Sequence, residues 1–358
     1  MAGRGNAIFA GLLGLVVMAA SLGINHAEAQ IKPQAQPSLR LLDFAELEGW
    51  DQDDHLDALK NFITTCDLLK GEEWKPICAF APQAAKDSDT ARAFFEAFFR
   101  PVQVGDGPAL FTGYYEPVLN GSLVRTPRFA YPLYRRPPDL VDGQPYHSRS
   151  MIDAGSLAGR GLELVWIDDP VEVFFLQIQG SGRVMLPNGR MMRVGYAGKN
   201  NHPYRSVGQE LIRRGTHSPA DMSAQSIKSW VRGNPVSGQG LLSSNPSYVF
   251  FRRIDTLSAA QGPIGAMGRS IATLRSLAVD PAHTPLGAPV WVEKEGAAPM
   301  RRLMVAQDTG GAIKGAQRGD IFFGTGKDAG RQAGNIKDKG RLVQLLPIER
   351  AYALLAKE

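Results

Sequence analysis

The chain of 358 residues is poor in cysteine and histidine, and its charge is nearly balanced. Two cysteines cannot form a cysteine-rich zinc site or a disulfide-dense scaffold, and the six histidines are scattered without an HxH or HxxxH pair. The formal charge is only +5, from 40 Lys and Arg against 35 Asp and Glu, and the basic residues do not cluster along the chain. We therefore expect no metal, no cofactor and no nucleic-acid partner.

Two motifs of well-known protein classes are incomplete. Asp308-Thr309-Gly310 has the sequence of an aspartic-protease motif, but these proteases need two such motifs so that two carboxylates share a proton. No second Asp-Thr-Gly or Asp-Ser-Gly occurs in the sequence. The glycine-rich stretch 324–330 lacks the Gly-Lys-Ser/Thr ending of a phosphate loop. The first absence disfavours a protease, and the second excludes a nucleotide-binding loop.

What the sequence does have is the composition of a folded protein with many turns. Hydrophobic residues make up 44% and charged residues 21%, which are typical globular values. The length suits two domains, or one domain with a large insertion. With 39 glycines and 24 prolines, short strands joined by turns are favoured over long helices. We predict a mainly β protein with accessory helices.

The first 30 residues have the pattern of a secretory signal peptide. Arg4 precedes an apolar stretch at residues 7–24, and Ala27-Glu28-Ala29 supplies the small-x-small site after which signal peptidases cut. We predict a signal peptide at residues 1–29. The alternative is a retained membrane anchor, since the apolar stretch approaches the length of a membrane span. No cysteine lies in this region, so we do not expect a lipid-modified amino terminus.

Export would place the two cysteines in an oxidising compartment. There we predict a disulfide bond between Cys66 and Cys78. The alternative is a pair of buried free thiols. We expect neither cysteine to be catalytic, because the sequence has no CxxC motif.

Periodic patterns predict the secondary structure. Apolar residues at helical spacing indicate helices over residues 54–69, 88–99, 206–214 and 223–232. Alternating and β-branched runs indicate strands at 171–179, 289–293, 302–307, 320–323 and 341–346, with a hairpin turn at 187–189. Residues 233–246, rich in Gly, Ser, Asn and Pro, are predicted to be a linker.

Segment 306–326 holds the strongest catalytic candidates. Asp308 and Asp320 lie next to predicted strands, on either side of a glycine-rich turn that contains Lys314. If the fold brings both carboxylates into one cleft, their like charge raises the pKa of one of them and prepares a general acid. Alternatively, both aspartates stabilise turns through neighbouring backbone amides.

Two further segments have side chains that suit a carbohydrate ligand. Thr112 and Tyr114, within residues 111–117, offer a hydroxyl group and an aromatic ring, although tyrosines in strands more often serve packing. Strand alternation places Gln177 and Gln179 on one face, just before Ser181, where their amides would line a groove. The alternative is that both glutamines face solvent.

Five segments, in this order, resemble the membrane-bound lytic murein transglycosylase A family. They are Phe-Thr-Gly-Tyr-Tyr-Glu-Pro (111–117), Phe-Leu-Gln-Ile-Gln-Gly-Ser-Gly (175–182), Gly-Tyr-Ala-Gly-Lys-Asn (195–200), Asn-Pro-Ser-Tyr-Val-Phe-Phe (245–251) and the segment 306–326. The carboxy-terminal part also resembles the three-aspartate (3D) domain, whose acids would here be Asp280, Asp308 and Asp320.

The resemblance implies a fold and a domain plan. The family fold is a double-psi β-barrel catalytic domain with a second β-barrel domain inserted into it and a groove between the two. On this chain the catalytic domain would comprise residues 37–117 and 241–358, and the inserted substrate-binding domain would comprise residues 118–240.

The resemblance also implies an activity. The family cleaves the β-1,4 bond between N-acetylmuramic acid and N-acetylglucosamine in peptidoglycan and leaves a 1,6-anhydromuramoyl end. One acid suffices, because the C6 hydroxyl of the sugar itself is the nucleophile. By motif position we assign Asp320 as the acid and base, with Asp308 in support. We assign substrate binding to Thr112, Tyr114, Gln177, Gln179, Ser181, Asn245 and Lys314.

The chain departs from the family pattern at its amino terminus. The name-giving members are outer-membrane lipoproteins attached through a cysteine, which this region lacks. We therefore expect a periplasmic monomer that is soluble or peripherally associated with the outer membrane or the sacculus. Its expected substrate is the glycan strands of peptidoglycan, and it works alone or with other cell-wall enzymes. Two other functions stay open: a hydrolytic muramidase that uses Asp308 and Asp320 as a pair, and a non-catalytic peptidoglycan-binding protein.

Overall fold

The structure is a computed structural model that describes residues 37–356. Every element described below belongs to one compact unit that begins at Pro37. The predicted signal peptide lies outside the described residues. Between residues 37 and 356, no helix has the length and apolar character needed to cross a membrane.

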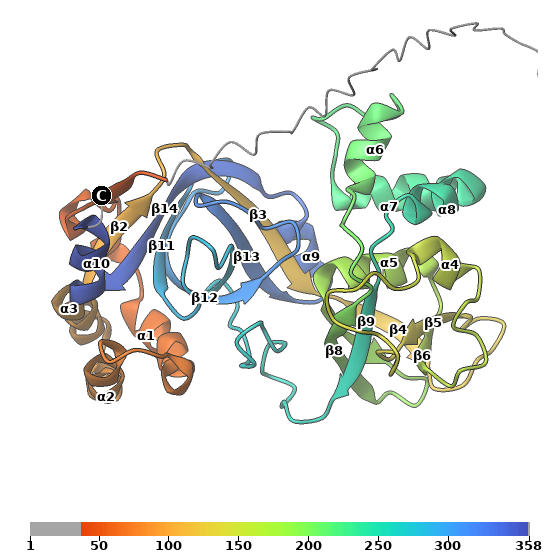
Figure 1. Ribbon diagram of the computed structural model, residues 1–358, viewed down its shortest axis with the longest axis horizontal. Helices are drawn as coiled ribbons and strands as arrows, with labels where there is room; N and C mark the ends of the chain where they lie inside the picture. The colour runs from red at the N-terminus through yellow and green to blue at the C-terminus, as the bar shows by residue number, and fades with distance from the viewer. Residues whose placement is uncertain (1–36, 357–358) are drawn as a thin grey trace, which may run out of the picture. The chain divides into compact units, whose positions relative to one another are not determined.

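A closed six-stranded β-barrel is the centre of the fold (Figure 1). Its strands are β3 (Ala109–Glu116), β10 (Ser276–Val279), β11 (Pro289–Lys294), β12 (Met300–Thr309), β13 (Arg318–Thr325) and β14 (Lys337–Pro347). They follow the order β14-β11-β12-β10-β13-β3, and β3 pairs back with β14 to close the ring. The β10–β12 and β3–β13 pairs are parallel. Two further strands, β2 (Phe99–Val104) and β1 (Leu39–Leu41), extend the sheet beyond β14.

Alternation along each strand separates the two faces of the barrel. Inward-facing side chains form a fully apolar core, which includes Phe111, Leu277, Val290, Met304, Ile321 and Leu342. Residues that alternate with these on β10 and β13 face outward. Asp320, next to Ile321, is therefore on the outer face of the barrel.

Helices cover another part of the outer face. They are α1 (His55–Ile63), α2 (Trp74–Ala84) and α3 (Ser88–Phe98), preceded by the 3-10 turns η1 (Phe44–Glu46) and η2 (Trp50–Gln52). Their apolar side chains, including the predicted phenylalanine stripe of α3, pack against Trp291 and Leu303 of the barrel. The last helix, α10 (Ile348–Leu355), packs near β2 and β14.

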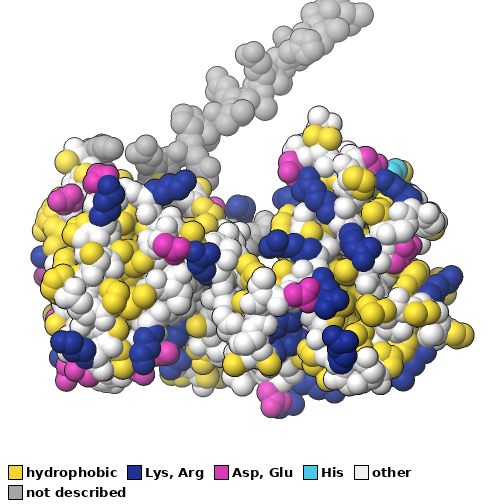
Figure 2. Space-filling model, turned by 90° about the horizontal axis from the view of Figure 1, so that it is seen from below, with side chains coloured by type: hydrophobic (Ala, Val, Ile, Leu, Met, Phe, Trp, Pro, Cys, Tyr) yellow, Lys and Arg dark blue, Asp and Glu magenta, His cyan; other side chains and the backbone are white. Residues whose placement is uncertain are grey.

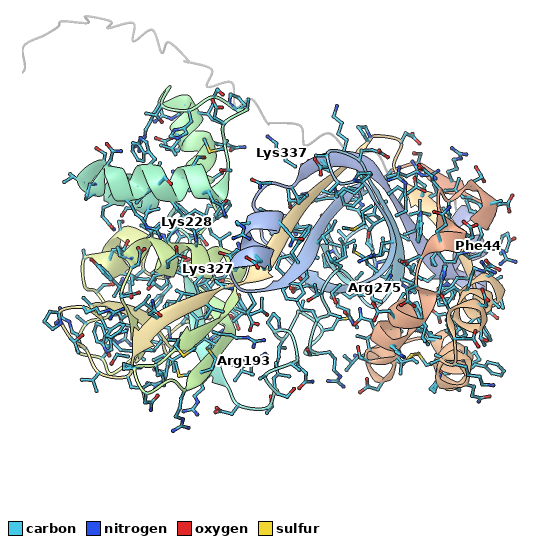
Figure 3. The ribbon with its side chains drawn as sticks, turned by 180° about the vertical axis from the view of Figure 1, so that it is seen from behind. Phe44, Arg193, Lys228, Arg275, Lys327 and Lys337 are labelled. Carbon is cyan, nitrogen blue, oxygen red and sulfur yellow. A yellow bond between two sulfur atoms is a disulfide. The ribbon has the colours of Figure 1, made fainter. Side chains whose placement is uncertain are left out.

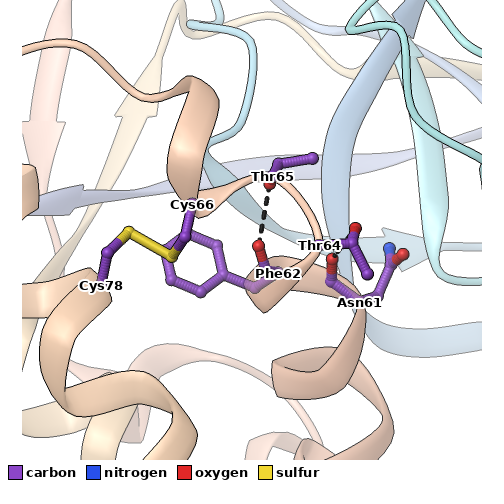
Figure 4. The surroundings of a disulfide bond; sticks show 6 residues. All are labelled: Asn61, Phe62, Thr64, Thr65, Cys66 and Cys78. Carbon is purple, nitrogen blue, oxygen red and sulfur yellow. Dashed lines mark hydrogen bonds between the residues drawn. A yellow bond between two sulfur atoms is a disulfide. The ribbon is translucent and has the colours of Figure 1, made fainter.

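Cys66 and Cys78 form the predicted disulfide bond (Figure 4). The bond joins a 3-10 turn, η3 (Cys66–Leu68), to α2. It ties together two segments whose apolar side chains belong to the same core cluster.

The double replacement Cys66→Ser and Cys78→Ser is expected to lower the free energy of unfolding by about 3 kcal/mol, because the bond closes a short loop and restricts the unfolded chain. Urea unfolding of the oxidised parent and of the variant measures the difference. The parent treated with a reductant should match the variant. A loss below about 1 kcal/mol in both cases would contradict the expectation.

A second sheet is built from the chain between β3 and β10. Its strands are β4 (Val118–Ser122), β5 (Tyr131–Tyr134), β6 (Glu163–Ile167), β7 (Ser181–Met185), β8 (Met191–Lys199) and β9 (Val249–Ile254). They follow the order β5-β6-β4-β7-β8-β9, and a bridge between Arg135 and Phe251 links the two edges. This sheet and the barrel confirm the predicted mainly β architecture. Because β9 belongs to the second sheet, we propose that the inserted domain ends after Ile254 and not at residue 240.

Several helices accompany the second sheet, and one of them corrects a prediction. They are α4 (Arg149–Asp153), α5 (Pro170–Gln179), α6 (Val207–Arg213), α7 (Ala224–Gly233) and α8 (Pro235–Ser243). The strand predicted over 171–179 is wrong, because this segment is the helix α5. The Asp169 side chain caps its first turn, Pro170 occupies the first turn, and Gly180 ends it with φ 77°. Most of its apolar residues are buried, so periodicity could not distinguish helix from strand.

The linker predicted at residues 233–246 is also wrong. Most of it is α8, which starts with a proline and buries Leu241 and Leu242 against α7 and its neighbours. The helix predicted over 54–69 is shorter, since α1 ends at Ile63. The helices predicted at 88–99, 206–214 and 223–232 and the strands predicted in the carboxy-terminal part are confirmed to within a few residues. The remaining helix, α9 (Lys327–Ala333), follows β13.

Candidate active site

The strand register brings Asp308, Asp320 and Thr112 into one row across the barrel. Ala278 on β10 pairs with Asp308 on β12 and with Asp320 on β13. Asp320 in turn pairs with Thr112 on β3. Since neighbouring strands lie about 4.8 Å apart, the backbones of the two aspartates are separated by roughly 10 Å. Both carboxylates predicted from the sequence therefore belong to one site.

An apolar cluster surrounds this row. Tyr114, Ile271, Ala278 and Phe322 are buried together, and the rings of Tyr114 and Phe322 lie 5.2 Å apart. The segment that returns from the second sheet passes closely over Asp308. A side chain at Gly265 would place its Cβ 2.7 Å from the carbonyl oxygen of Gln307, so only glycine fits there.

Asp320 is half-buried and has one oxygen free. The hydroxyl of Thr112 donates to its Oδ1, and its Oδ2 has no protein hydrogen-bond partner between residues 37 and 356. Burial raises the pKa of Asp320 to about 6. The hydrogen bond from Thr112 and the positive charge of Arg318 lower this pKa in part, whereas the charge of Asp308 adds to the increase. A carboxyl group of this kind can hold and release a proton near neutral pH.

Asp308 is half-buried and has both oxygens occupied. Its Oδ1 accepts hydrogen bonds from the backbone N–H groups of Ala266 (3.0 Å) and Thr309 (2.9 Å), and its Oδ2 accepts one from the hydroxyl of Tyr114 (2.9 Å). Burial raises its pKa, against the effect of these three hydrogen bonds. The pKa of Tyr114 is well above its usual value, because Tyr114 is buried next to Asp308. Tyr114 therefore remains a hydrogen-bond donor.

Asp280, the third aspartate, has a different position. It is buried, and its carboxylate accepts hydrogen bonds from the backbone N–H groups of Gly315 (2.9 Å) and Ala282 (3.3 Å). Lys314 lies 3.6 Å from it and has an exposed side chain. Burial alone would raise the pKa of Asp280, but these bonds lower it below its usual value. Asp280 thus holds the loop between β12 and β13, and Lys314 contacts Asp280 and neither Asp308 nor Asp320.

The other predicted binding residues lie in the inserted part of the chain. Gln179 is half-buried, and its Oε1 accepts from the backbone N–H of Tyr115 (2.9 Å). Gln177, Ser181 and Asn245 are buried. The Oε1 of Gln177 accepts from the buried guanidinium of Arg149, which also donates to the backbone oxygen of Asn245. These contacts stabilise the inserted part from within.

A buried charge pair ties the second sheet to the barrel. Glu116, at the end of β3, binds Arg183 on β7 (2.7 Å) and the hydroxyl of Thr325 on β13 (2.7 Å). Arg183 donates to backbone oxygens of residues 259–262, and so does Arg193, which is labelled in Figure 3. These bonds fix the returning segment that delivers the N–H of Ala266 to Asp308. On the face in Figure 2, the surface is notched between the barrel side and the inserted side.

The sequence did not predict the roles of Arg318, Ala266 and the Glu116–Arg183 pair at the site. Arg318 offered a signal, because it lies two positions before Asp320 and so shares its strand face. The contact of Ala266 is a backbone hydrogen bond and carries no side-chain signal. Within the described part of the chain, no group of three or more His, Cys, Asp or Glu side chains is arranged to hold a metal ion.

The fold and the site define a class: an acid–base enzyme built on a β-barrel, with a second β domain inserted beside the acid. Two family models match the chain, the MltA specific insert domain over residues 110–252 and the 3D domain over residues 275–346. The membrane-bound lytic murein transglycosylase A of Vibrio cholerae serotype O1 is 35% identical over 67% of this chain. The match spans 66% of that relative's length, just under two thirds.

Solved structures match over more of the chain. The membrane-bound lytic murein transglycosylase from Agrobacterium tumefaciens is 31% identical, with a TM-score of 0.79, over 88% of this chain and 99% of that one. The structure of Escherichia coli MltA with bound chitohexaose is 30% identical, with a TM-score of 0.67, over 87% of this chain and 93% of that one. This chain belongs to the membrane-bound lytic murein transglycosylase A family.

Proposed function

We propose that this protein is a lytic transglycosylase. It cleaves the β-1,4 bond between N-acetylmuramic acid and N-acetylglucosamine in peptidoglycan and forms 1,6-anhydromuramoyl ends. The observation that carries the proposal is Asp320, a half-buried carboxyl group with one free oxygen and a pKa of about 6. The chitohexaose bound to the Escherichia coli relative supports a β-1,4-linked amino-sugar strand as the ligand.

The first step breaks the glycosidic bond. Asp320 begins protonated and donates its proton to the bridging oxygen, while the bond from that oxygen to C1 of the muramic acid breaks. The leaving strand departs with a neutral hydroxyl group. Asp320 becomes a carboxylate, which the hydroxyl of Thr112 stabilises through Oδ1.

The second step closes the anhydro ring. The oxygen of the C6 hydroxyl bonds to C1, and its proton passes to the carboxylate of Asp320. The acid is restored, and no water is consumed. One carboxyl group thus acts first as acid and then as base.

Asp308 supports this chemistry without reacting. Its oxygens already accept three hydrogen bonds, which hold the carboxylate in place and leave only one lone-pair direction, on Oδ2, so we assign it a supporting role. Its negative charge helps to keep the pKa of Asp320 high. This arrangement favours a single-acid transglycosylase over a hydrolytic muramidase, which needs two working carboxyl groups.

The substrate contacts are divided between the two sheets. We assign Thr112 and Tyr114 to positioning the carboxylates, since their hydroxyl groups bind Asp320 and Asp308. The amide nitrogen of Gln179 is left to donate to a sugar, because only the oxygen of this side chain binds Tyr115. We assign Gln177, Ser181 and Asn245 to shaping the inserted domain. Lys314 is exposed on the loop after β12, where it can meet the substrate strand.

We further propose that the enzyme works in the cell envelope and that residues 1–29 export it to the periplasm. Three of its properties support this: the peptidoglycan chemistry, the disulfide bond and the signal-like amino terminus. Its relatives carry the name membrane-bound.

The reaction rate is expected to fall as the pH rises through about 6, the pKa of Asp320. Only the protonated form can donate in the first step, so deprotonation of the free enzyme removes activity, about tenfold for each pH unit above that pKa. The pH dependence of kcat/KM on soluble glycan fragments measures this decline. A rate that stays constant between about pH 5 and pH 8 would contradict the assignment of Asp320 as the acid.

Mass spectrometry of the muropeptides released from purified sacculi by residues 30–358 tests the function itself. Products with anhydromuramoyl ends support the proposal. Products with reducing ends would instead show a hydrolytic muramidase. Binding to sacculi without any release would show a non-catalytic binding protein.

A further inference from the structure

We propose that Arg318 is a positioning residue, which directs the hydroxyl of Thr112 toward Asp320 and so leaves the reactive proton on Oδ2 of Asp320. The inference rests on the proposed function, since it takes Asp320 as the acid. It adds a residue that acts on the acid through a second side chain.

The three side chains form a relay on the outer face of the barrel. Arg318 and Asp320 are two positions apart on β13 and share a face. Asp320 pairs with Thr112 on the neighbouring strand β3. The Nη2 of Arg318 donates to the hydroxyl oxygen of Thr112 (2.7 Å), and this hydroxyl donates to Oδ1 of Asp320.

The guanidinium sets the direction of the second hydrogen bond. A guanidinium has only donors, so the oxygen of Thr112 must accept from Arg318. That bond weakens the remaining lone pair of the hydroxyl as an acceptor and strengthens its hydrogen as a donor. The hydrogen therefore goes to Oδ1 of Asp320, and the acid proton occupies Oδ2, the oxygen without a protein partner.

Hydrogen bonds to backbone oxygens fix the position of the Arg318 guanidinium. Its Nη1 donates to the backbone oxygens of Gly319 (2.6 Å) and Leu110 (3.2 Å), which fix the guanidinium plane. Within residues 37–356, Arg318 makes no ion pair with any carboxylate, so it reaches Asp320 through the hydrogen bonds of Thr112 and through its positive charge, which Arg318→Lys keeps. Burial lowers the pKa of Arg318, but a guanidinium stays charged throughout the working pH range.

Other titratable groups lie near Asp320 but do not bind the hydroxyl of Thr112. Asp308 faces it from β12 and Tyr114 from β3. Lys337, labelled in Figure 3, pairs with Thr112 from β14, and its side chain is exposed. None of these groups contacts the hydroxyl of Thr112 through a hydrogen bond given by the structure, so the direction of that hydroxyl depends on Arg318.

A double-mutant cycle on soluble glycan fragments tests the relay. Arg318→Lys keeps the positive charge but replaces a planar fork with a single nitrogen, whereas in the parent Nη1 binds the two backbone oxygens and Nη2 binds Thr112. In the parent it is expected to lower kcat about tenfold, with KM nearly unchanged, as for a lost hydrogen bond to a charged network. In the Thr112→Val background the same change is expected to lower kcat less than about twofold, because the relay is already broken. Thr112→Ser, which retains the hydroxyl, should keep most of the activity.

The controls separate failure of the relay from failure of the function. Arg100→Lys replaces an arginine that donates to the backbone oxygens of Glu96 and Phe99, and it should leave kcat unchanged. If Arg318→Lys lowers kcat by the same factor in both backgrounds, or not at all in the parent, the relay is wrong. If the parent forms no anhydromuropeptides, or if Asp320→Asn stays active, the proposed function or its acid is wrong instead. Thermal unfolding of every variant shows whether the fold is retained.

Discussion

Asp320→Asn is expected to lower the release of anhydromuropeptides about a thousandfold, the middle of the range for the loss of a general acid and base. An amide keeps the shape of the side chain but cannot donate an acidic proton in the first step or accept one in the second. The loss should appear in kcat, with binding to sacculi preserved. Release rates measured by mass spectrometry under identical conditions give the ratio.

Asp320→Asn should not destabilise the fold, which distinguishes a lost acid from a lost structure. The pKa of Asp320 is about 6 in the folded protein and about 4 in an unfolded chain, so the fold is favoured at low pH and loses that advantage as pH rises from about 4 to about 6. Near pH 7 a neutral amide removes this cost, and the melting temperature should stay equal or increase.

The matched control is Asp328→Asn. Within residues 37–356, the exposed Asp328 on α9 pairs only with Arg331, so its replacement should leave both rate and stability unchanged. If Asp320→Asn retains more than about a tenth of the parental rate, another group supplies the proton.

Asp308→Asn is expected to lower the rate at neutral pH by ten- to a hundredfold, as estimated for a broken buried network. An amide nitrogen facing the hydroxyl of Tyr114 removes an acceptor, and the segment that carries Ala266 loses part of its anchor. The negative charge that raises the pKa of Asp320 is also lost. The pKa of Asp320 therefore falls, and the alkaline decline in kcat/KM moves to lower pH.

Asp280→Asn is the control for Asp308, since both aspartates belong to the same 3D domain. Asp280 holds the backbone of Gly315 and is not among the groups that shift the pKa of Asp320, so its replacement should weaken the loop after β12 but leave the alkaline decline where it is. A pH profile that moves for Asp280→Asn and stays fixed for Asp308→Asn would reverse the two roles.

The sequence predicted the features that depend on local pattern. Strands β11 to β14 contain short apolar runs bounded by glycine-containing turns, so the sequence predicts their positions to within a few residues. The two aspartates were found because they flank one such turn. The cysteine pair was found because no other cysteine competes for pairing.

The wrong predictions concern segments whose structure depends on tertiary packing. Helix α5 is apolar on most of its surface and is surrounded by the second sheet and its helices, so its residues fit a buried strand equally well. Its proline, aspartate cap and terminal glycine were the available signals for a helix. The segment of α8 is rich in Gly, Ser and Pro, a composition typical of loops, so the sequence predicted a linker there.

The electrostatics of the site could not be derived from the sequence. The difference between Asp320 and Asp308 depends on which oxygens accept hydrogen bonds from strands and segments far away along the chain. Both aspartates are half-buried, yet one has a free oxygen and the other has none. Our proposal of Asp320 as the acid rests on this difference and on burial, which raises the pKa of Asp308 and raises that of Asp320 to about 6.

Digestion of sacculi in water labelled with heavy oxygen tests most directly the claim that one carboxyl group cleaves the strand without water. We predict that the released muropeptides carry anhydromuramoyl ends and no heavy oxygen, because the C6 hydroxyl supplies the bonding oxygen. Heavy oxygen at C1 of the new muramic acid ends would show that water attacks, and would contradict both the transglycosylase mechanism and the supporting role of Asp308.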